Sequence, residues 1–102
     1  IISSLRLSYQ CERIALEIAR AVEEKMILSG RDPLSIAAAC SFIAADYTGE
    51  SRPQRDFART VHCTEVTLRA RVREVIECLG GRHAVNKLVE NLYEQLQYLM
   101  VS

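Results

Sequence analysis

Six arginines between residues 52 and 73 are the side chains of this sequence best suited to recognition chemistry. They share that segment with only two acids, Asp56 and Glu65, which leaves it a net charge of +4 in a chain whose formal net charge is zero. The planar guanidinium group of arginine binds phosphate and the edge of guanine through paired hydrogen bonds. The six are Arg52, Arg55, Arg59, Arg69, Arg71 and Arg73. This local charge favours a nucleic-acid contact, and the alternative is a helix corner whose arginines pair with acids elsewhere on the chain.

The four cysteines and two histidines are the candidate metal ligands, but their spacing does not favour a site. The cysteines are Cys11, Cys40, Cys63 and Cys78, and no two of them form a C-x-x-C pair. His62 adjoins Cys63, and His83 follows Cys78 by five residues. A zinc site needs deprotonated ligands that converge in tetrahedral geometry. We therefore expect small buried thiols in a reducing compartment, with no metal and no cofactor.

The sequence lacks the parts that an enzyme site requires. It has no glycine-rich phosphate loop, no Ser, His and Asp set to which roles can be assigned, and no carboxylate pair placed for tuning by apolar burial. It also has no signal-peptide layout and no run of about 18 apolar residues. We therefore predict a protein that is not an enzyme, with no small-molecule substrate and no membrane contact. Because the chain starts with IISS and no Met, we expect it to be a piece of something longer.

The stretch from Gly30 to Ala45 is the element around which the fold is organised. Asp32 is a good N-cap, and Pro33 suits the first helical position, where its missing N–H costs nothing. From Leu34 to Ala45 the only polar residues are two serines. A helix that is apolar on every face must be buried on every face, and this one is too short to span a membrane. The pattern predicts a central, alanine-rich core helix.

Amphipathic helices precede and follow this stretch. The first runs from about Tyr9 to about Ile27, has Ser8 as its N-cap, and places its apolar residues at the helical period. These residues are Cys11, Ile14, Ala15, Ile18, Val22 and Met26. The last covers 82–102, and its apolar stripe predicts packing on the core of the same domain. The stripe consists of Val85, Leu88, Val89, Leu92, Leu96, Leu99 and Met100.

A short helix, a tight turn and a longer helix lie between them. The short helix is expected over Pro53 to Val61 with Ser51 as its N-cap. His62-Cys63 forms the link, and Thr64 caps the longer helix, which Gly80-Gly81 ends. Inward apolar contacts are expected from Phe57, Ala58, Val61, Val66, Leu68, Val72, Val75, Ile76 and Leu79. The chain is therefore predicted to be all-α, with a helix-turn-helix near its middle.

Five blocks occur in an order and spacing that resemble a known family. They are SSLRLS, IALEIARAV, GRDPLSIAAACSFIAA, RPQRDFA and EVTLRARVREVI. The third is the most distinctive, because Gly-Arg, the proline, a hydroxyl-then-apolar pair and the alanine run all recur in it. Residues 3–79 thus resemble the second cyclin-like repeat of the transcription factor IIB family, a pattern that the archaeal and RNA polymerase III counterparts share. The alanine run of this chain is closer to the sequence of the polymerase II-type members than to that of the other members.

The resemblance implies a fold and a role. The fold is a cyclin-like five-helix bundle around the central helix, ending in the helix-turn-helix, with residues 1–81 as the repeat and its first helix mostly missing. Residues 82–102 would be an extra C-terminal helix packed on, or extending, the same domain. Family members bind the complex of TATA-binding protein with promoter DNA, upstream of TATA, and bridge it to RNA polymerase. The resemblance therefore implies a nuclear transcription initiation factor with these three partners, the polymerase being polymerase II.

The same resemblance assigns DNA contacts to the start of the longer helix. Val66 and Arg69 match the family's apolar and arginine contacts in the major groove, and Arg73 matches a further basic position. On general grounds Val66 can pack on a thymine methyl group, and Arg69 can reach guanine acceptor atoms. Arg52 and Arg55 would then be phosphate contacts, which position the protein without reading sequence.

The sequence departs from the family at two positions, and two other classes of protein stay open. His62 stands where the family usually has Gly in the turn, Thr60 stands where it has an apolar residue, and a neutral chain is less basic than strong DNA binding favours. One alternative is a cyclin-type protein-binding module whose arginines never meet DNA. Loss of partner binding when the charges on the face of the first helix are reversed would indicate such a module. The other is a homo-oligomerising helical domain built on the 82–102 stripe, indicated by a two-chain mass that Leu92→Asp reduces to one.

Overall fold

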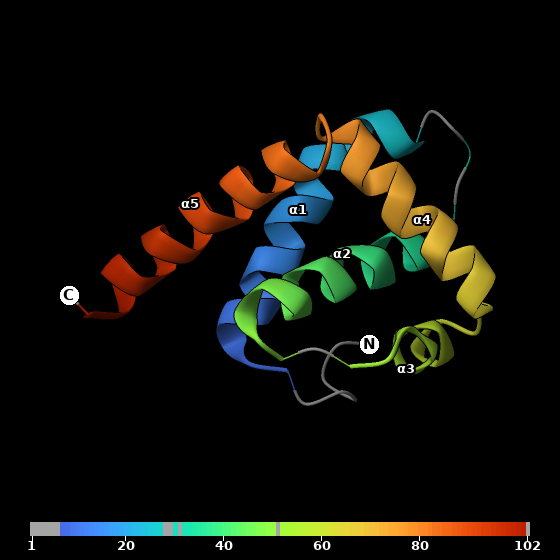
Figure 1. Ribbon diagram of the computed structural model, residues 1–102, viewed down its shortest axis with the longest axis horizontal. Helices are drawn as coiled ribbons and strands as arrows, with labels where there is room; N and C mark the ends of the chain where they lie inside the picture. Colours follow the sequence, from blue (N-terminus) through green and yellow to red (C-terminus); the bar gives the residue numbers. More distant parts are fainter. Residues whose placement is uncertain (1–6, 28–29, 31, 51, 102) are drawn as a thin grey trace.

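The fold is a bundle of helices joined by short links (Figure 1). The computed structural model describes residues 7–27, 30, 32–50 and 52–101, and over these residues it contains five helices and no strand. They are α1 (Tyr9–Ile27), α2 (Pro33–Thr48), α3 (Gln54–Thr60), α4 (Glu65–Cys78) and α5 (Arg82–Val101). The all-α prediction is confirmed. The expected end of a preceding helix falls on the first six residues, which lie outside the described part.

The alanine-rich helix α2 lies at the centre of the bundle, where it contacts each of the other four helices (Figure 1). Its buried residues are Ser35, Ile36, Ala38, Ala39, Cys40, Ser41, Ala44 and Ala45. Small side chains let the neighbouring helices approach closely, so the prediction of a central helix is confirmed. Burial on every face is wrong for the first turn. Leu34 is 50% exposed there, because this turn lies at the surface of the bundle. Asp32 and Pro33 beside it are exposed as well.

Side-chain caps begin three of the helices, as the sequence predicts. The hydroxyl of Ser8 accepts a hydrogen bond from the N–H of Cys11 at 3.1 Å. The carboxylate of Asp32 accepts one from the N–H of Leu34 at 3.1 Å. The hydroxyl of Thr64 accepts one from the N–H of Thr67, also at 3.1 Å. Each cap satisfies a backbone donor that the helix itself leaves without a partner.

The two glycines after α4 end it with a pair of backbone hydrogen bonds. The N–H of Gly80 donates to the carbonyl of Glu77 at 3.1 Å, and the N–H of Gly81 donates to the carbonyl of Ile76 at 2.9 Å. Both glycines have positive φ, 101° and 106°. This is the paired arrangement in which left-handed residues close a helix C-terminus, and it confirms the predicted stop.

The start of α3 differs from the prediction. The helix begins at Gln54, one residue later than expected, and Pro53 takes the N-cap position. The ψ angle of Pro53 is 145°, which is extended rather than helical, so its carbonyl instead accepts the first hydrogen bond, from the N–H of Asp56 at 3.0 Å. The cap proposed at Ser51 lies outside the described residues.

All five helices contribute side chains to the core. The predicted inward positions of α1 are buried, namely Cys11, Ile14, Ala15, Ile18 and Val22, while the side chain of Met26 is outside the described part. Among the described side chains of α5, Val85 and Val89 are fully buried, and Leu92 and Leu96 are half-buried. The end of α5 extends beyond the other helices (Figure 1). The described part of the apolar stripe therefore packs on the core as far as Leu96, and the side chains of Leu99 and Met100 are not described.

Candidate nucleic-acid interface

The helix-turn-helix is held to the core through α3. Phe57 and Ala58 are buried, and the ring of Phe57 meets the ring of Phe42 on α2 edge to face, with centroids 5.5 Å apart. Val61, directly after α3, is buried as well. These contacts confirm the inward side predicted for α3, and they fix the position from which α4 departs.

A left-handed residue makes the turn between α3 and α4. His62 has a φ of 56°, the only positive φ of a non-glycine residue in the described chain. The carbonyl of Ala58 accepts hydrogen bonds from the N–H groups of Val61 at 3.2 Å and Cys63 at 3.0 Å. This backbone conformation costs an L-residue free energy and costs glycine little. The glycine that the resemblance leads us to expect at this position would meet no such cost, and His62 keeps the turn at a cost.

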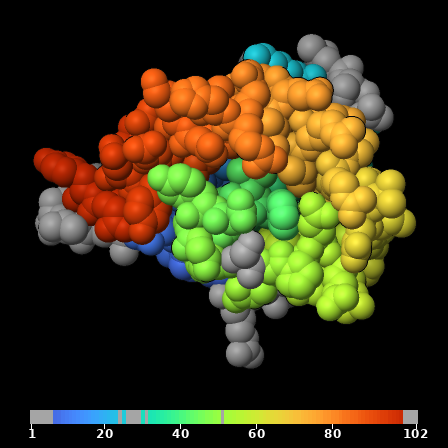
Figure 2. Space-filling model, viewed as in Figure 1, coloured from blue at the N-terminus to red at the C-terminus, as the bar shows by residue number. Residues whose placement is uncertain are grey.

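The two sides of α4 have different surroundings. Leu68, Val72 and Val75 are buried against the core. Val66 is 71% exposed, and Arg69 and Arg73 are exposed on the same outward side. The inward contact predicted for Val66 is therefore wrong, because Val66 lies on the side of α4 opposite to the buried Leu68 and Val75. Figure 2 shows α4 at the edge of the molecule, where this outward side meets solvent.

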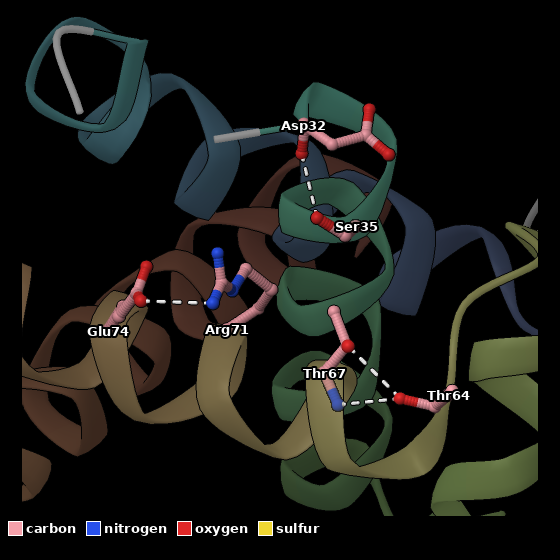
Figure 3. Close-up of polar contacts among 6 residues, drawn as sticks. All are labelled: Asp32, Ser35, Thr64, Thr67, Arg71 and Glu74. Atoms are coloured by element: carbon pink, nitrogen blue, oxygen red, sulfur yellow. Dashed lines mark hydrogen bonds and ion pairs between the residues drawn. The ribbon is translucent and has the colours of Figure 1, made fainter. Parts of the chain in front are cut away.

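Arg71 is turned away from the outward side of α4. Its side chain is only 14% exposed and forms an ion pair with Glu74 at 3.2 Å. Figure 3 shows it lying between α4 and the first turns of α2. Its Nε atom is buried and has no hydrogen-bond partner within the described residues. Arg69 and Arg71 are only two positions apart on α4. Arg69 is nevertheless available to a partner, whereas Arg71 is packed within the bundle.

The arginines before α4 also separate into two kinds. Arg52 is half-buried, and its Nη1 donates a hydrogen bond to the carbonyl of Glu50 at 2.9 Å. One of its donors is therefore already bound within the link after α2. Arg55 and Arg59 are exposed on α3, four residues apart. The sequence gives Arg59 no predicted role beyond its charge. Its spacing of four residues from Arg55 nevertheless indicates that both arginines lie on one side of the helix. The exposed basic set is therefore Arg55, Arg59, Arg69 and Arg73.

All four cysteines are free thiols, of which Cys11 and Cys40 are buried as predicted, whereas Cys63 and Cys78 are only partly buried. Burial raises the pKa of Cys11 to about 11 and that of Cys40 to about 12, so both stay protonated at neutral pH. Burial also raises the pKa of Cys63, and the charge of Asp32 adds to the effect. Within the described residues no three His, Cys, Asp or Glu side chains gather to hold a metal ion. In the same residues no helix is long and apolar enough to cross a membrane.

The fold and the exposed side of α4 define a class of protein, an all-α, cyclin-like domain that ends in a helix-turn-helix. Within this class the family is shown directly, because residues 1–78 match the family model described as the transcription factor TFIIB repeat. The chain belongs to the TFIIB family, whose members are transcription initiation factors. The helix α5 begins at Arg82, beyond the last matched residue.

Three archaeal relatives illustrate the match. The chain is 41% identical over 78 residues to the transcription initiation factor IIB of Archaeoglobus fulgidus, which covers 76% of the chain and 24% of the relative. It is 42% identical over 80 residues to the factor of the same name from Pyrodictium occultum, with 78% and 26% covered. It is 44% identical over 77 residues to transcription initiation factor IIB 1 of Thermoplasma volcanium, with 76% and 25% covered. The chain thus spans about a quarter of the length of these relatives.

Proposed function

We propose that this chain is the domain of a general transcription initiation factor that binds promoter DNA upstream of TATA, together with TATA-binding protein, and helps to recruit RNA polymerase. The role is non-enzymatic: the domain holds partners in place. Val66, Arg69 and Arg73 read or line the major groove, and Arg55 contacts phosphate. Arg52 takes a smaller part, since one of its donors already binds the carbonyl of Glu50.

One observation supports the proposal more than any other. An apolar side chain that is 71% exposed stands beside two exposed arginines on the outward side of the second helix of a helix-turn-helix. In helix-turn-helix proteins the N-terminal residues of the second helix contact base edges in the major groove. An exposed valine fits a thymine methyl group, and arginine fits the acceptors of guanine. The identities of the protein partners rest on the family and not on this surface.

The first test measures binding of the full-length protein to a TATA-containing duplex, with and without TATA-binding protein, across a salt series. We expect binding that requires TATA-binding protein and weakens as salt rises, since phosphate contacts release counterions. Arg69→Ala should cost about 1–3 kcal/mol and relax preference at one base pair. Arg55→Ala should weaken binding to all sequences alike and lower the salt slope by about 1. If the wild-type protein binds no duplex under any condition, the proposal is wrong.

The matched control separates this role from that of a cyclin-type protein-binding module. Arg20 is exposed on α1, away from α3 and α4 in the sequence, and pairs with Glu17 of its own helix at 3.4 Å. Arg20→Glu should leave DNA binding unchanged. A protein that loses its partners with Arg20→Glu and keeps them with Arg69→Ala is a protein-interaction module instead.

The family supports a proposal for the location of the protein. A transcription factor works where chromosomal DNA lies, and we propose the nucleus, as the polymerase II-type alanine run favours. The relatives compared above are archaeal, and an archaeal source would place the protein at the nucleoid. Sedimentation tests the remaining alternative: one chain per particle is expected, and a two-chain mass that Leu92→Asp halves would indicate an oligomer built on α5.

A further inference from the structure

Glu65 is an acidic residue at the start of a surface that is otherwise apolar and basic. It is the first residue of α4, is exposed, and directly precedes Val66. Arg69 follows it by four residues, which places the two side chains one above the other on the same side of the helix. In the described part of the chain no ion pair joins Glu65 to Arg69. The carboxylate therefore stays available to a partner that approaches the outward side of α4.

A carboxylate in this position is unfavourable against DNA unless it meets a donor. The groove is lined by phosphates, whose charge repels it, and Asp56 is the only other acid between residues 52 and 73. Among the base edges in the major groove, the N4 amino group of cytosine is the donor from which Glu typically accepts a hydrogen bond. The acceptors of guanine suit the neighbouring arginine. Glu65 and Arg69 together therefore present an acceptor and a donor to successive G·C pairs.

We infer that Glu65 is a specificity-determining residue, whose carboxylate accepts a hydrogen bond from the N4 amino group of a cytosine in the major groove and disfavours sequences without that donor. The inference rests on the proposed function, since it requires α4 to enter the groove. It assigns to Glu65 a role distinct from its effect on the helix, where an acid in the first turn stabilises the N-terminus through the dipole.

The test compares the wild-type protein with Glu65→Gln and Glu65→Ala in complexes with TATA-binding protein. Competitor duplexes each carry one base-pair change upstream of TATA, and one is an unrelated sequence. The wild-type protein should prefer cytosine by about tenfold at one position. Glu65→Ala should lose this preference and bind the unrelated duplex more tightly, because a charge that repels phosphate is gone. Glu65→Gln, which keeps one oxygen acceptor, should retain part of the preference.

Glu77 provides the matched control. It is an exposed acid on α4, three turns further along, near the end that leaves the groove. Glu77→Ala should leave the preference at every base pair unchanged. Thermal melts of the free proteins report the purely helical role of Glu65, which changes stability and not preference.

Each outcome decides the inference. Loss of cytosine preference at one position in Glu65→Ala, but not in Glu77→Ala, supports it. An unchanged preference profile in a wild-type protein that binds specifically overturns the inference alone, whatever happens to stability. A wild-type protein that binds no duplex overturns the proposed function as well.

Discussion

The carboxylate of Glu50, just after α2, accepts two hydrogen bonds from Ser8, just before α1. The donors are the backbone N–H and the hydroxyl of Ser8, both at 2.6 Å, and the two residues are 42 positions apart in the sequence. The hydroxyl of Thr48 donates to the same carboxylate at 2.8 Å. Because Ser8 also caps α1, Glu50 connects the start of α1 to the end of α2.

The charge of Glu50 is matched to this arrangement. Burial on its own raises the pKa of its carboxyl group, but hydrogen bonds from Ser8 and Thr48 and the positive charge of Arg52 hold the pKa below its usual range. A carboxyl group with a lowered pKa in the folded state stabilises the fold above its unfolded pKa of about 4.3. That contribution is lost as pH falls through the folded pKa.

Glu50→Gln should lower the free energy of unfolding by about 1 kcal/mol at neutral pH, since the charge-assisted hydrogen bonds become ordinary ones at a partly exposed site. Urea melts at neutral pH and below the folded pKa of Glu50 measure the effect. The gap between the variant and the wild-type protein should close in acid, where Glu50 is protonated. Glu23→Gln, at an exposed position of α1, is the control and should show no gap. A gap that persists in acid would show that the charge of Glu50 does not matter.

His62→Gly should raise the free energy of unfolding by about 1 kcal/mol, because glycine adopts the left-handed conformation of the turn without steric cost. His83→Gly is the matched control: His83 lies in the first turn of α5, and glycine there should lower stability by up to about 1 kcal/mol. Thermal or urea melts compare the two. If both variants lose stability, the left-handed turn at position 62 carries no cost, contrary to the argument given above.

Arg71→Ala and Arg69→Ala should show opposite effects. Arg71→Ala removes a largely buried side chain and its ion pair with Glu74, so the free energy of unfolding should fall by about 1–2 kcal/mol. Arg69→Ala, at an exposed position, should change stability by no more than about 0.5 kcal/mol. Binding to the promoter duplex, measured where both variants are folded, should be weakened by Arg69→Ala alone. Weakened binding by Arg71→Ala under those conditions would contradict the assignment of Arg71 to packing.

Val89→Ala tests whether α5 is part of the same folding unit as the matched repeat. Val89 is buried in the shared core, so the loss of two methyl groups should cost about 2 kcal/mol in a single cooperative transition. Lys87→Ala, at an exposed position of α5, should change stability by less than about 0.5 kcal/mol. If the unfolding transition is the same in both variants, α5 is an appendage with no share in the stability of the repeat.

Helix positions could be predicted from the sequence because their signals are local. Asp32, Ser8 and Thr64 each cap a helix through a hydrogen bond to a residue two or three positions on. The two glycines after α4 end it through bonds within six residues. The apolar run from Leu34 also predicted a central helix, since its composition leaves no side for solvent. The bounds of α3 were each misplaced by one residue. Val61 follows the helix, and Pro53 precedes it because proline suits both the first helical position and the extended residue before it.

The arginines show the limit of such signals. Arg69 and Arg71 have the same chemistry and lie in the same basic segment. The local charge counted both alike and did not show that Arg71 would be packed in the bundle while Arg69 stayed exposed. That depends on how α4 packs against α2, and the same packing exposes Val66 where an inward contact was expected. The sequence by itself determined the helices, their order and the family, because these depend on near neighbours and on a recognisable pattern. Only the tertiary structure decided which charges remain available to a partner and which pairs, such as Ser8 and Glu50, meet across the chain, because these depend on residues far apart in sequence.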